Sequence, residues 1–307
     1  MSNISQENTS HPCEEPVYYY STIGSIVDWV ILLVGLPEVC LACYALLCLL
    51  KKDKLAPIFA INLLLSDLLQ IGIMVVFIVS RFFDPTSDRF LRARCVARLF
   101  VRLGLSSSLS FMLLISAERF IMVACPVWHH TKNNVKLSVL ISVCTWIFSL
   151  AFSSLDYFLM RHAKFPSWLF SILCLLPSPF LLGFFIGTWK ALNKSTAMRH
   201  RAPNRRRVLG VLGLVLGTYA VLFFPFSFRN LYYSLKADAD SDTADSVRDL
   251  SGIFTSALVY LSPLLDPLLY IFIRRDIRDT MAAFPCCNTI LMKLKGFKDS
   301  PQTVTAL

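Results

Sequence analysis

Apolar residues occur along the chain in seven long blocks separated by shorter polar segments. A helix that crosses a lipid bilayer needs about 20 mostly apolar residues. The blocks contain runs such as Val30–Leu36 and Phe180–Ile186, whereas membrane β-strands alternate over about ten residues. The pattern therefore predicts seven membrane-spanning helices, in the ranges Thr22–Leu50, Pro57–Val79, Cys95–Ala124, Val135–Phe158, Trp168–Trp189, Val208–Leu235 and Leu250–Ile273.

Composition agrees with a membrane protein. Hydrophobic residues make up 55% of the 307 residues and charged residues only 16%, with a mean hydropathy of +0.59. A soluble domain carries about 25% charged residues. Met1–Ser21 lacks the basic and apolar regions of a signal peptide, so the first helix is expected to act as its own insertion signal.

The positive charges indicate which side faces the cytosol. With the N-terminus outside, 19 of the 30 Lys and Arg residues fall in the inner segments, and an excess of these residues marks the cytoplasmic side. Glycosylation sequons at Asn3 and Asn8 favour the same orientation. Basic loops beside anionic lipid account for the net charge of +10 without a nucleic-acid partner.

We therefore predict an all-α membrane protein, a seven-transmembrane helix bundle with a short amphipathic eighth helix over Arg275–Phe284. Residues 1–21 would form an extracellular tail, residues 22–273 the seven-helix domain, and residues 274–307 the eighth helix and cytoplasmic tail. The expected location is the plasma membrane.

Polar residues inside the spans are candidates for function, because placing them in lipid is costly. They are Asp67 in the second block, Glu118-Arg119-Phe120 ending the third, Phe223 and Pro225 in the sixth, and Asp266-Pro267 followed by Tyr270 in the seventh. In this order they resemble the helix signatures of rhodopsin-like G-protein-coupled receptors, and the resemblance covers nearly the whole chain.

The resemblance implies a role for each motif. Glu118, Arg119 and Phe120 would form the switch that meets a heterotrimeric G protein, with the adjacent glutamate restraining the arginine. Phe223 and Pro225 would form the hinge of helix six, and Asp266, Pro267 and Tyr270 the helix-seven motif. The alternatives are an arginine that only reaches the membrane interface and a static proline kink. Phe120 and Phe223 depart from the usual tyrosine and tryptophan.

An internal sodium site is implied in the same way. Asp67, Ser108 and Asp266 match the positions that hold the ion in the family. The alternative is a hydrogen-bonded polar core without an ion. No other cofactor is expected.

The family also implies a disulfide between the outer end of helix three and the second outer loop. Cys95 has the first position, but Met160–Ser167 contains no cysteine. We expect this standard bond to be missing, with Cys13 or Cys174 as the alternative partners of Cys95. The short loop suggests an open ligand entrance, as in Mas-related receptors.

Three arginines could bind an anionic ligand. Arg98 and Arg102 are four residues apart and share a helix face, and Arg229 lies one turn beyond Pro225. Guanidinium groups bind carboxylates and phosphates in bidentate geometry, which favours a lipid acid, nucleotide or carboxylate. Alternatively, these arginines pair with Asp156, Asp249 or lipid phosphates.

Some ligand classes are disfavoured. Val101 stands where amine receptors place an aspartate, and Leu250–Ile273 has no lysine for retinal. Proton sensing usually needs histidine, and only His11 and His162 are expected outside. The chain resembles the nucleotide-, lipid- and proton-sensing branch as well as Mas-related receptors. A peptide ligand also stays open.

The C-terminal segment carries modification and partner signals. Cys286 and Cys287 are palmitoylation candidates, or free thiols in a reducing cytosol. Thr305-Ala306-Leu307 resembles a ligand of PDZ proteins, although three residues match easily by chance.

The predicted function is a receptor and not an enzyme, because no catalytic motif or metal-ligand spacing occurs. A non-signalling decoy receptor is the alternative. A transporter is less favoured, because no internal repeat is visible.

Overall fold

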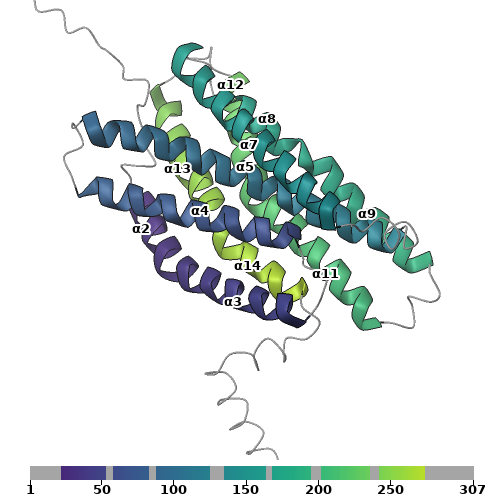
Figure 1. The fold of residues 1–307 in the computed structure, drawn as a ribbon. Helices are drawn as coiled ribbons and strands as arrows, with labels where there is room; N and C mark the ends of the chain where they lie inside the picture. The colour runs from purple at the N-terminus through teal and green to yellow at the C-terminus, as the bar shows by residue number, and fades with distance from the viewer. Residues whose placement is uncertain are drawn as a thin grey trace, which may run out of the picture.

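The structure, a computed structural model, describes residues 22–52, 58–82, 88–124, 135–163, 168–194, 202–235 and 242–273. These ranges are helical almost throughout and contain no strand. Figure 1 shows the helices lying lengthwise in one bundle. The prediction of an all-α helix bundle is confirmed, while the predicted eighth helix at Arg275–Phe284 lies outside the described residues.

The seven predicted spans correspond to the following elements. They are α2 (Thr22–Val30), η1 (Ile31–Gly35) and α3 (Leu36–Lys52) for helix one, α4 (Ile58–Arg81) for helix two, α5 (Asp88–Ala124) for helix three, α7 (Val135–Ala163) for helix four, α8 (Trp168–Leu175) and α9 (Pro177–Lys194) for helix five, α11 (Ala202–Thr218), η2 (Tyr219–Phe223) and α12 (Phe224–Leu235) for helix six, and α13 (Asp242–Tyr260) and α14 (Ser262–Ile273) for helix seven. We call the end of the bundle where helix one begins the Thr22 end, and the opposite end, where α5 finishes, the Ala124 end.

Among the described residues, six helices are long and apolar enough to cross a membrane. The seventh predicted span is helical too, but it is divided at Leu261 between α13 and α14. Pro263 has no N–H group, and the Leu261 N–H is shared between the carbonyls of Ala257 and Leu258 at 3.2 and 3.1 Å. The proline thus explains why the helix is interrupted at this point.

Several helices extend further than the apolar blocks predicted. Helix three begins at Asp88 and helix six at Ala202, several residues before the predicted starts at Cys95 and Val208. Helix four continues to Ala163 instead of ending at Phe158. Hydropathy reports the part of a helix that fits the bilayer, whereas backbone hydrogen bonding allows polar turns to continue beyond it.

Helices one and six each contain a π-helical turn two residues before a proline. The turn Ile31–Gly35 precedes Pro37, and the turn Tyr219–Phe223 precedes Pro225. In helix six the Phe224 N–H donates to the Tyr219 carbonyl, five residues back. Each proline removes a backbone donor, so both helices have a wider turn beside a missing hydrogen bond.

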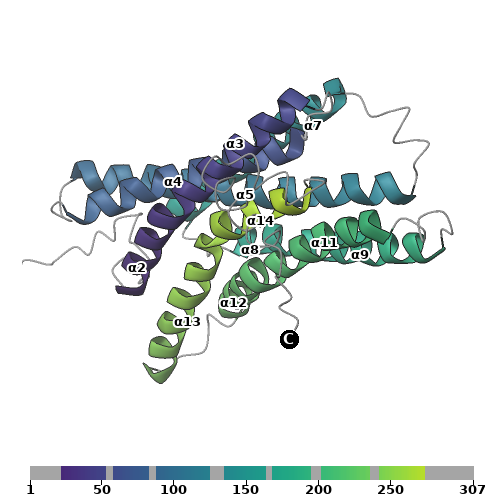
Figure 2. The same cartoon turned by 90° about the horizontal axis from the view of Figure 1, so that it is seen from below.

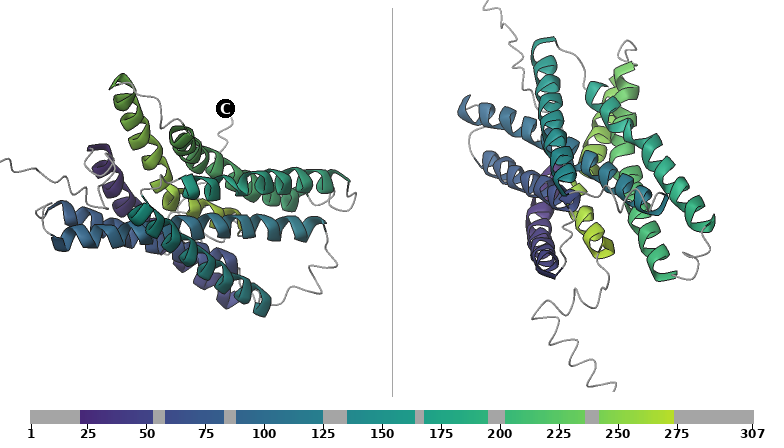
Figure 3. Two further views of the ribbon diagram at one scale, coloured as in Figure 1. Left: turned by 90° about the horizontal axis from the view of Figure 1, so that it is seen from above. Right: turned by 45° about the vertical axis from the view of Figure 1, so that its right-hand side comes forward.

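Helix three is the centre of the bundle. In the most apolar stretch of helix three, 67% of the residues are buried, whereas in the corresponding stretch of helix four only 11% are buried. Figures 2 and 3 show α5 running through the middle of the bundle, where it packs on α4, α7 and α9. The exposed apolar side chains of α7, such as Ile147 and Phe148, form a surface suited to lipid.

Candidate functional site

The predicted switch lies at the Ala124 end of α5. Within the described residues, Glu118 and Arg119 form no ion pair with each other, and the buried Arg119 Nε has no hydrogen-bond partner. This arrangement does not contain the expected contact between the arginine and its neighbour, and the role of the motif as a switch stays a prediction. A buried guanidinium nitrogen without an acceptor is costly, which makes Arg119 a group that gains from an incoming partner.

Phe120 packs against helix five. Its ring stacks on Phe184 with 5.4 Å between the ring centroids. It also lies against Gly187, where an added Cβ would come within 2.7 Å of Phe120 Cε2. The glycine therefore permits a close contact between α5 and α9 that a larger residue would prevent.

The predicted sodium-site residues come together in the middle of the bundle. Asp67 from α4, Ser108 from α5 and Asp266 from α14 are each fully buried. The Ser108 hydroxyl donates to Asp266 Oδ2 at 3.0 Å, and the two carboxyl groups are near enough to interact directly. Neither oxygen of Asp67 has a hydrogen-bond partner by distance and angle, so this core would carry unbalanced negative charge if both carboxyl groups were ionised.

A buried amide covers this core on the side of the Thr22 end. The Gln70 amide donates to the Ser66 carbonyl at 3.4 Å, and its Oε1 accepts from the Ser262 hydroxyl at 3.3 Å. An added Cβ at Gly104 would lie 2.5 Å from Gln70 Cγ. The absence of a side chain on α5 at this position therefore makes room for Gln70.

Arg102 is paired with Asp156 of helix four. The Arg102 Nη1 and Asp156 Oδ2 form an ion pair, and the side chains are 14% and 2% exposed. The Arg102 guanidinium also lies 5.6 Å from the centroid of the Phe170 ring of α8. Of the two sequence-based alternatives for Arg102, pairing with Asp156 is the one observed. Arg98 is half-buried on the same helix and interacts electrostatically with Arg102.

Arg229 lies between helices six and seven. Its Nε donates to the Ser251 hydroxyl at 3.0 Å, its Nη1 donates to Asn230 Oδ1 at 2.9 Å, and its guanidinium lies 5.2 Å from the Tyr233 ring centroid. An added Cβ at Gly252 would be 2.5 Å from its Nη2. Arg229 therefore contacts side chains of helices six and seven, whereas Arg102 contacts side chains of helices four and five.

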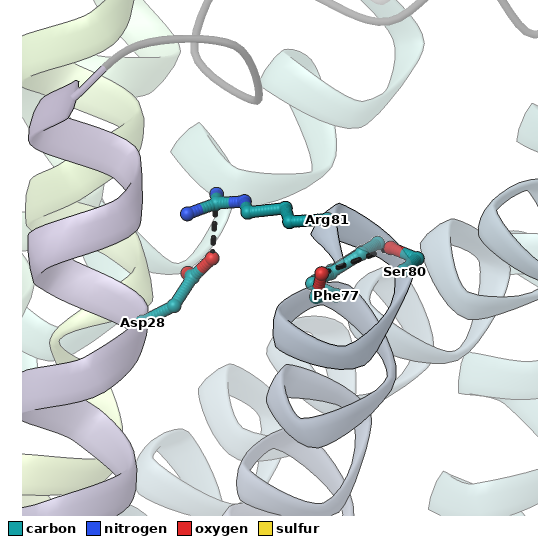
Figure 4. A network of polar contacts seen from close by, with 4 residues as sticks. All are labelled: Asp28, Phe77, Ser80 and Arg81. Atoms are coloured by element: carbon teal, nitrogen blue, oxygen red, sulfur yellow. Dashed lines mark hydrogen bonds and ion pairs between the residues drawn. The ribbon is translucent and has the colours of Figure 1, made fainter. Parts of the chain in front are cut away.

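A second ion pair near the Thr22 end was missed from the sequence. Arg81 Nη2 at the end of α4 lies 2.8 Å from Asp28 Oδ2 on α2. Figure 4 shows the two side chains pointing toward each other. The Asp28 side chain is only 2% exposed. An acidic residue within the first apolar block is itself a signal, but the sequence does not show which basic residue meets it.

The helix-six residues are positioned by the π-helical turn. Phe223 is fully buried and its ring stacks on Tyr219, with 6.3 Å between the centroids. The Tyr219 hydroxyl donates to the Cys174 carbonyl of α8 at 2.9 Å. Tyr219 carries no motif signal, and only the structure identifies it as a link between helices five and six.

Cys95 is engaged in a disulfide, while Cys174 is a free, buried thiol. The expectation that Cys95 lacks the standard partner in the second loop remains untested, but Cys174 as its partner is wrong. The other proposed partner, Cys13, lies outside the described residues. The same holds for Asn3, Asn8, Cys286, Cys287 and the C-terminal Thr305–Leu307, and for the side chain of Tyr270.

Comparison with known proteins identifies the family. Residues 39–270 match the family model described as 7 transmembrane receptor (rhodopsin family). The chain is 24% identical to chemokine XC receptor 1 of Mus musculus, with 85% of this chain and 82% of the relative covered. It is 25% identical to G-protein coupled receptor 68 of Homo sapiens, with 94% of this chain and 85% of the relative covered. It is 23% identical to lysophosphatidic acid receptor 6 of Homo sapiens, with 89% of this chain and 87% of the relative covered. The chain, a multi-pass membrane protein, therefore belongs to the rhodopsin family of seven-transmembrane receptors.

Proposed function

We propose that this receptor lies in the plasma membrane with its Thr22 end outside the cell. Binding of a ligand with an anionic group would be transmitted to a heterotrimeric G protein at the Ala124 end. The distribution of Lys and Arg residues supports this orientation. Among the relatives, one is named for lysophosphatidic acid and another for a chemokine. A lipid with an anionic head group and an acidic peptide segment both fit this ligand class.

The observation that carries the proposal is the pair of arginines on α5. Arg98 and Arg102 lie toward the Thr22 end of the helix, one turn apart and close enough to interact electrostatically. The structure places one carboxylate, that of Asp156, against Arg102. Two guanidinium groups one turn apart on the same helix are suited to binding a carboxylate or phosphate group of a ligand.

The effect of ligand binding would reach helix six through a contact between two aromatic side chains inside the bundle. The Phe170 ring that faces Arg102 packs on Phe226 of α12 with 6.3 Å between the centroids. A ligand bound at Arg102 would therefore be connected to Phe226 of helix six through the single intervening ring of Phe170. A ligand that favours one position of helix six shifts the population toward that position, and Arg119 at the other end of α5 would then meet the G protein.

The test is G-protein activation in cells that express the full chain, over a panel of anionic lipids, nucleotides, carboxylates and peptides. Arg98→Gln and Arg102→Gln should each weaken the response at least tenfold, and Arg119→Ala should abolish it. Arg92→Gln is the matched control, because Arg92 is an exposed arginine on the same helix. All variants are compared at equal surface expression.

An agonist whose potency is unchanged by both Arg98→Gln and Arg102→Gln would refute the anion site. A ligand that binds without activating any G protein, with Arg119→Ala having no effect, would support the decoy alternative. Either result leaves the family membership unaffected.

We further propose that the Asp67–Asp266 pair holds one positive charge, either a sodium ion or a proton. The unpartnered oxygens of Asp67, fully buried beside a second carboxyl group, support this fit. Asp67, Ser108 and Asp266 would supply oxygen ligands, which suit a hard cation. A bound cation would tie helices two, three and seven together through charge.

The melting temperature of the purified receptor distinguishes the two occupants. For sodium, the wild type should melt higher in NaCl than in choline chloride; for a proton, it should instead respond to pH. Asp67→Asn should remove either dependence, because a neutral amide no longer needs a positive charge. A wild type as insensitive as the variant to both sodium and pH would contradict this proposal.

A further inference from the structure

Helix one carries a second acidic residue inside its span, besides Asp28. Glu38 of α3 lies within the apolar stretch Thr22–Tyr44, which is long enough to cross a membrane. Along the helix axis it lies about 20 Å or more from both Thr22 and Lys52, the two ends of helix one. The hydrocarbon core of a bilayer is about 30 Å thick, so the carboxyl group of Glu38 lies at the depth of this core.

Glu38 lies at the border between the packed side and the lipid-facing side of helix one. About one turn away along the helix, Val34 and Leu41 are 53% and 52% exposed, whereas Gly35 and Ala42 are buried. Residues three and four positions apart share a helix face, and Glu38 itself is half-buried. Its side chain therefore reaches the surface of the bundle that faces lipid.

The bundle does not supply a partner for this carboxyl group. Within the part of the chain that the structure describes, Glu38 forms no hydrogen bond or ion pair. Asp28, by contrast, is paired with Arg81. An ionisable group inside a membrane is costly and is ordinarily paired or functional. A partner for Glu38 is therefore to be sought outside the bundle.

Helix one has an open side on which such a partner can lie. Outside helix one, α3 packs mainly on α4 and α14, and Figure 1 shows α2 and α3 along the edge of the bundle. Only 28% of the most apolar stretch of helix one is buried. A further transmembrane helix can therefore lie along α3 and contact Glu38.

The chemistry of Glu38 favours a second copy of this chain as that partner. An isolated carboxylate in lipid is so unfavourable that the group is neutralised by a proton, and a neutral carboxyl group is both a hydrogen-bond donor and an acceptor. It can therefore pair with an identical group. Two copies in one membrane share their orientation, so a twofold axis along the membrane normal brings both Glu38 residues to the same depth. We propose that two copies of this receptor associate through helix one, with their Glu38 carboxyl groups hydrogen-bonded to each other.

The experiment counts copies of the full-length receptor in liposomes. Receptor with one fluorophore at its C-terminus is reconstituted at several protein-to-lipid ratios, and photobleaching steps give the fraction of dimers. Glu38→Leu should weaken association about tenfold, which lies within the range of interhelical hydrogen bonds in membranes. Glu38→Gln should associate like the wild type, because an amide is also both donor and acceptor.

A second measurement leaves Glu38 unchanged. Val34→Cys and Leu41→Cys each place a thiol on the face of Glu38, and under mild oxidation at least one of them should give a disulfide-linked dimer. The exposed thiol of the native Cys40 is the control, because a residue two positions from Glu38 points to the opposite side of the helix. The wild type should therefore form no dimer linked through Cys40.

Three results would overturn the proposal. The first is a wild-type receptor that stays monomeric at every protein-to-lipid ratio, or that associates no better than Glu38→Leu. The second is linking through Cys40 as efficient as linking through the introduced thiols, since the contact would then lie on another side of the helix. The third is association in cells that depends on Glu38 but is absent in liposomes, which would identify a partner helix of different chemistry, such as a basic one.

Discussion

The hydrogen bond between Tyr219 and the Cys174 carbonyl predicts a measurable effect of a single oxygen atom. The donor lies in the π-helical turn of helix six and the acceptor near the end of α8, at a distance of 2.9 Å. Both residues are buried, at 2% and 1% exposure. Tyr219→Phe removes the hydroxyl and leaves the ring, which stacks on Phe223, in place.

The magnitude follows from the cost of losing one buried hydrogen bond. Such a bond contributes about 1 kcal/mol on balance, and about 1.4 kcal/mol corresponds to a tenfold change in an equilibrium. Any displacement of helix six that moves Tyr219 away from α8 breaks this bond. Tyr219→Phe should therefore raise the population of such displaced arrangements about fivefold.

Hydrogen exchange measures this population directly. Amides in η2 should exchange about fivefold faster in Tyr219→Phe, because exchange of protected amides requires local opening. Nucleotide exchange on a G protein without ligand should rise in parallel if the proposed function is correct. Tyr232→Phe, at a 47% exposed position on the same helix, is the control and should behave as the wild type. Exchange in η2 no faster than in this control would refute the reasoning.

Two further predictions concern packing and covalent structure. Gly104→Ala should lower the free energy of unfolding by about 1–3 kcal/mol, because the added methyl group overlaps Gln70. Gly72→Ala, whose Cβ would meet nothing within 4 Å, should be neutral or slightly stabilising in the same thermal melts. We also expect Cys13 to be the partner of Cys95, since it is the other cysteine predicted outside the membrane. Non-reducing peptide mapping should find the two linked, and finding Cys95 joined elsewhere would contradict this expectation.

The sequence predicted the parts of the fold that depend on local composition. Apolar length marked every span, and motif order placed Asp67, Ser108 and Asp266 together, where the structure shows them buried in one core. It did not give the helix ends, because polar turns continue beyond the bilayer. It also could not choose the partner of Arg102, because that choice depends on how α5 and α7 are rotated against each other.

Other features had no sequence signal that periodicity could detect. A π-helical turn such as η2 adds one residue within a helix without changing its composition. The close approach of Gly187 to Phe120 depends on the distance between two helices. Asp28 could have been selected as a charge in an apolar block, but its pairing with Arg81 joins residues that are 53 positions apart.

The extra residue in η2 sets the rotational phase between the two halves of helix six. One residue of an α-helix corresponds to about 100° of rotation. Deleting Ala220 would restore regular winding and turn Arg229, on the far side of the turn, away from Ser251 and Gly252. Substitutions in η2 alter packing at one place, whereas a one-residue deletion would change which side of α12 faces helix seven. A receptor related to this chain but lacking that residue would therefore present a different set of side chains to the same ligand.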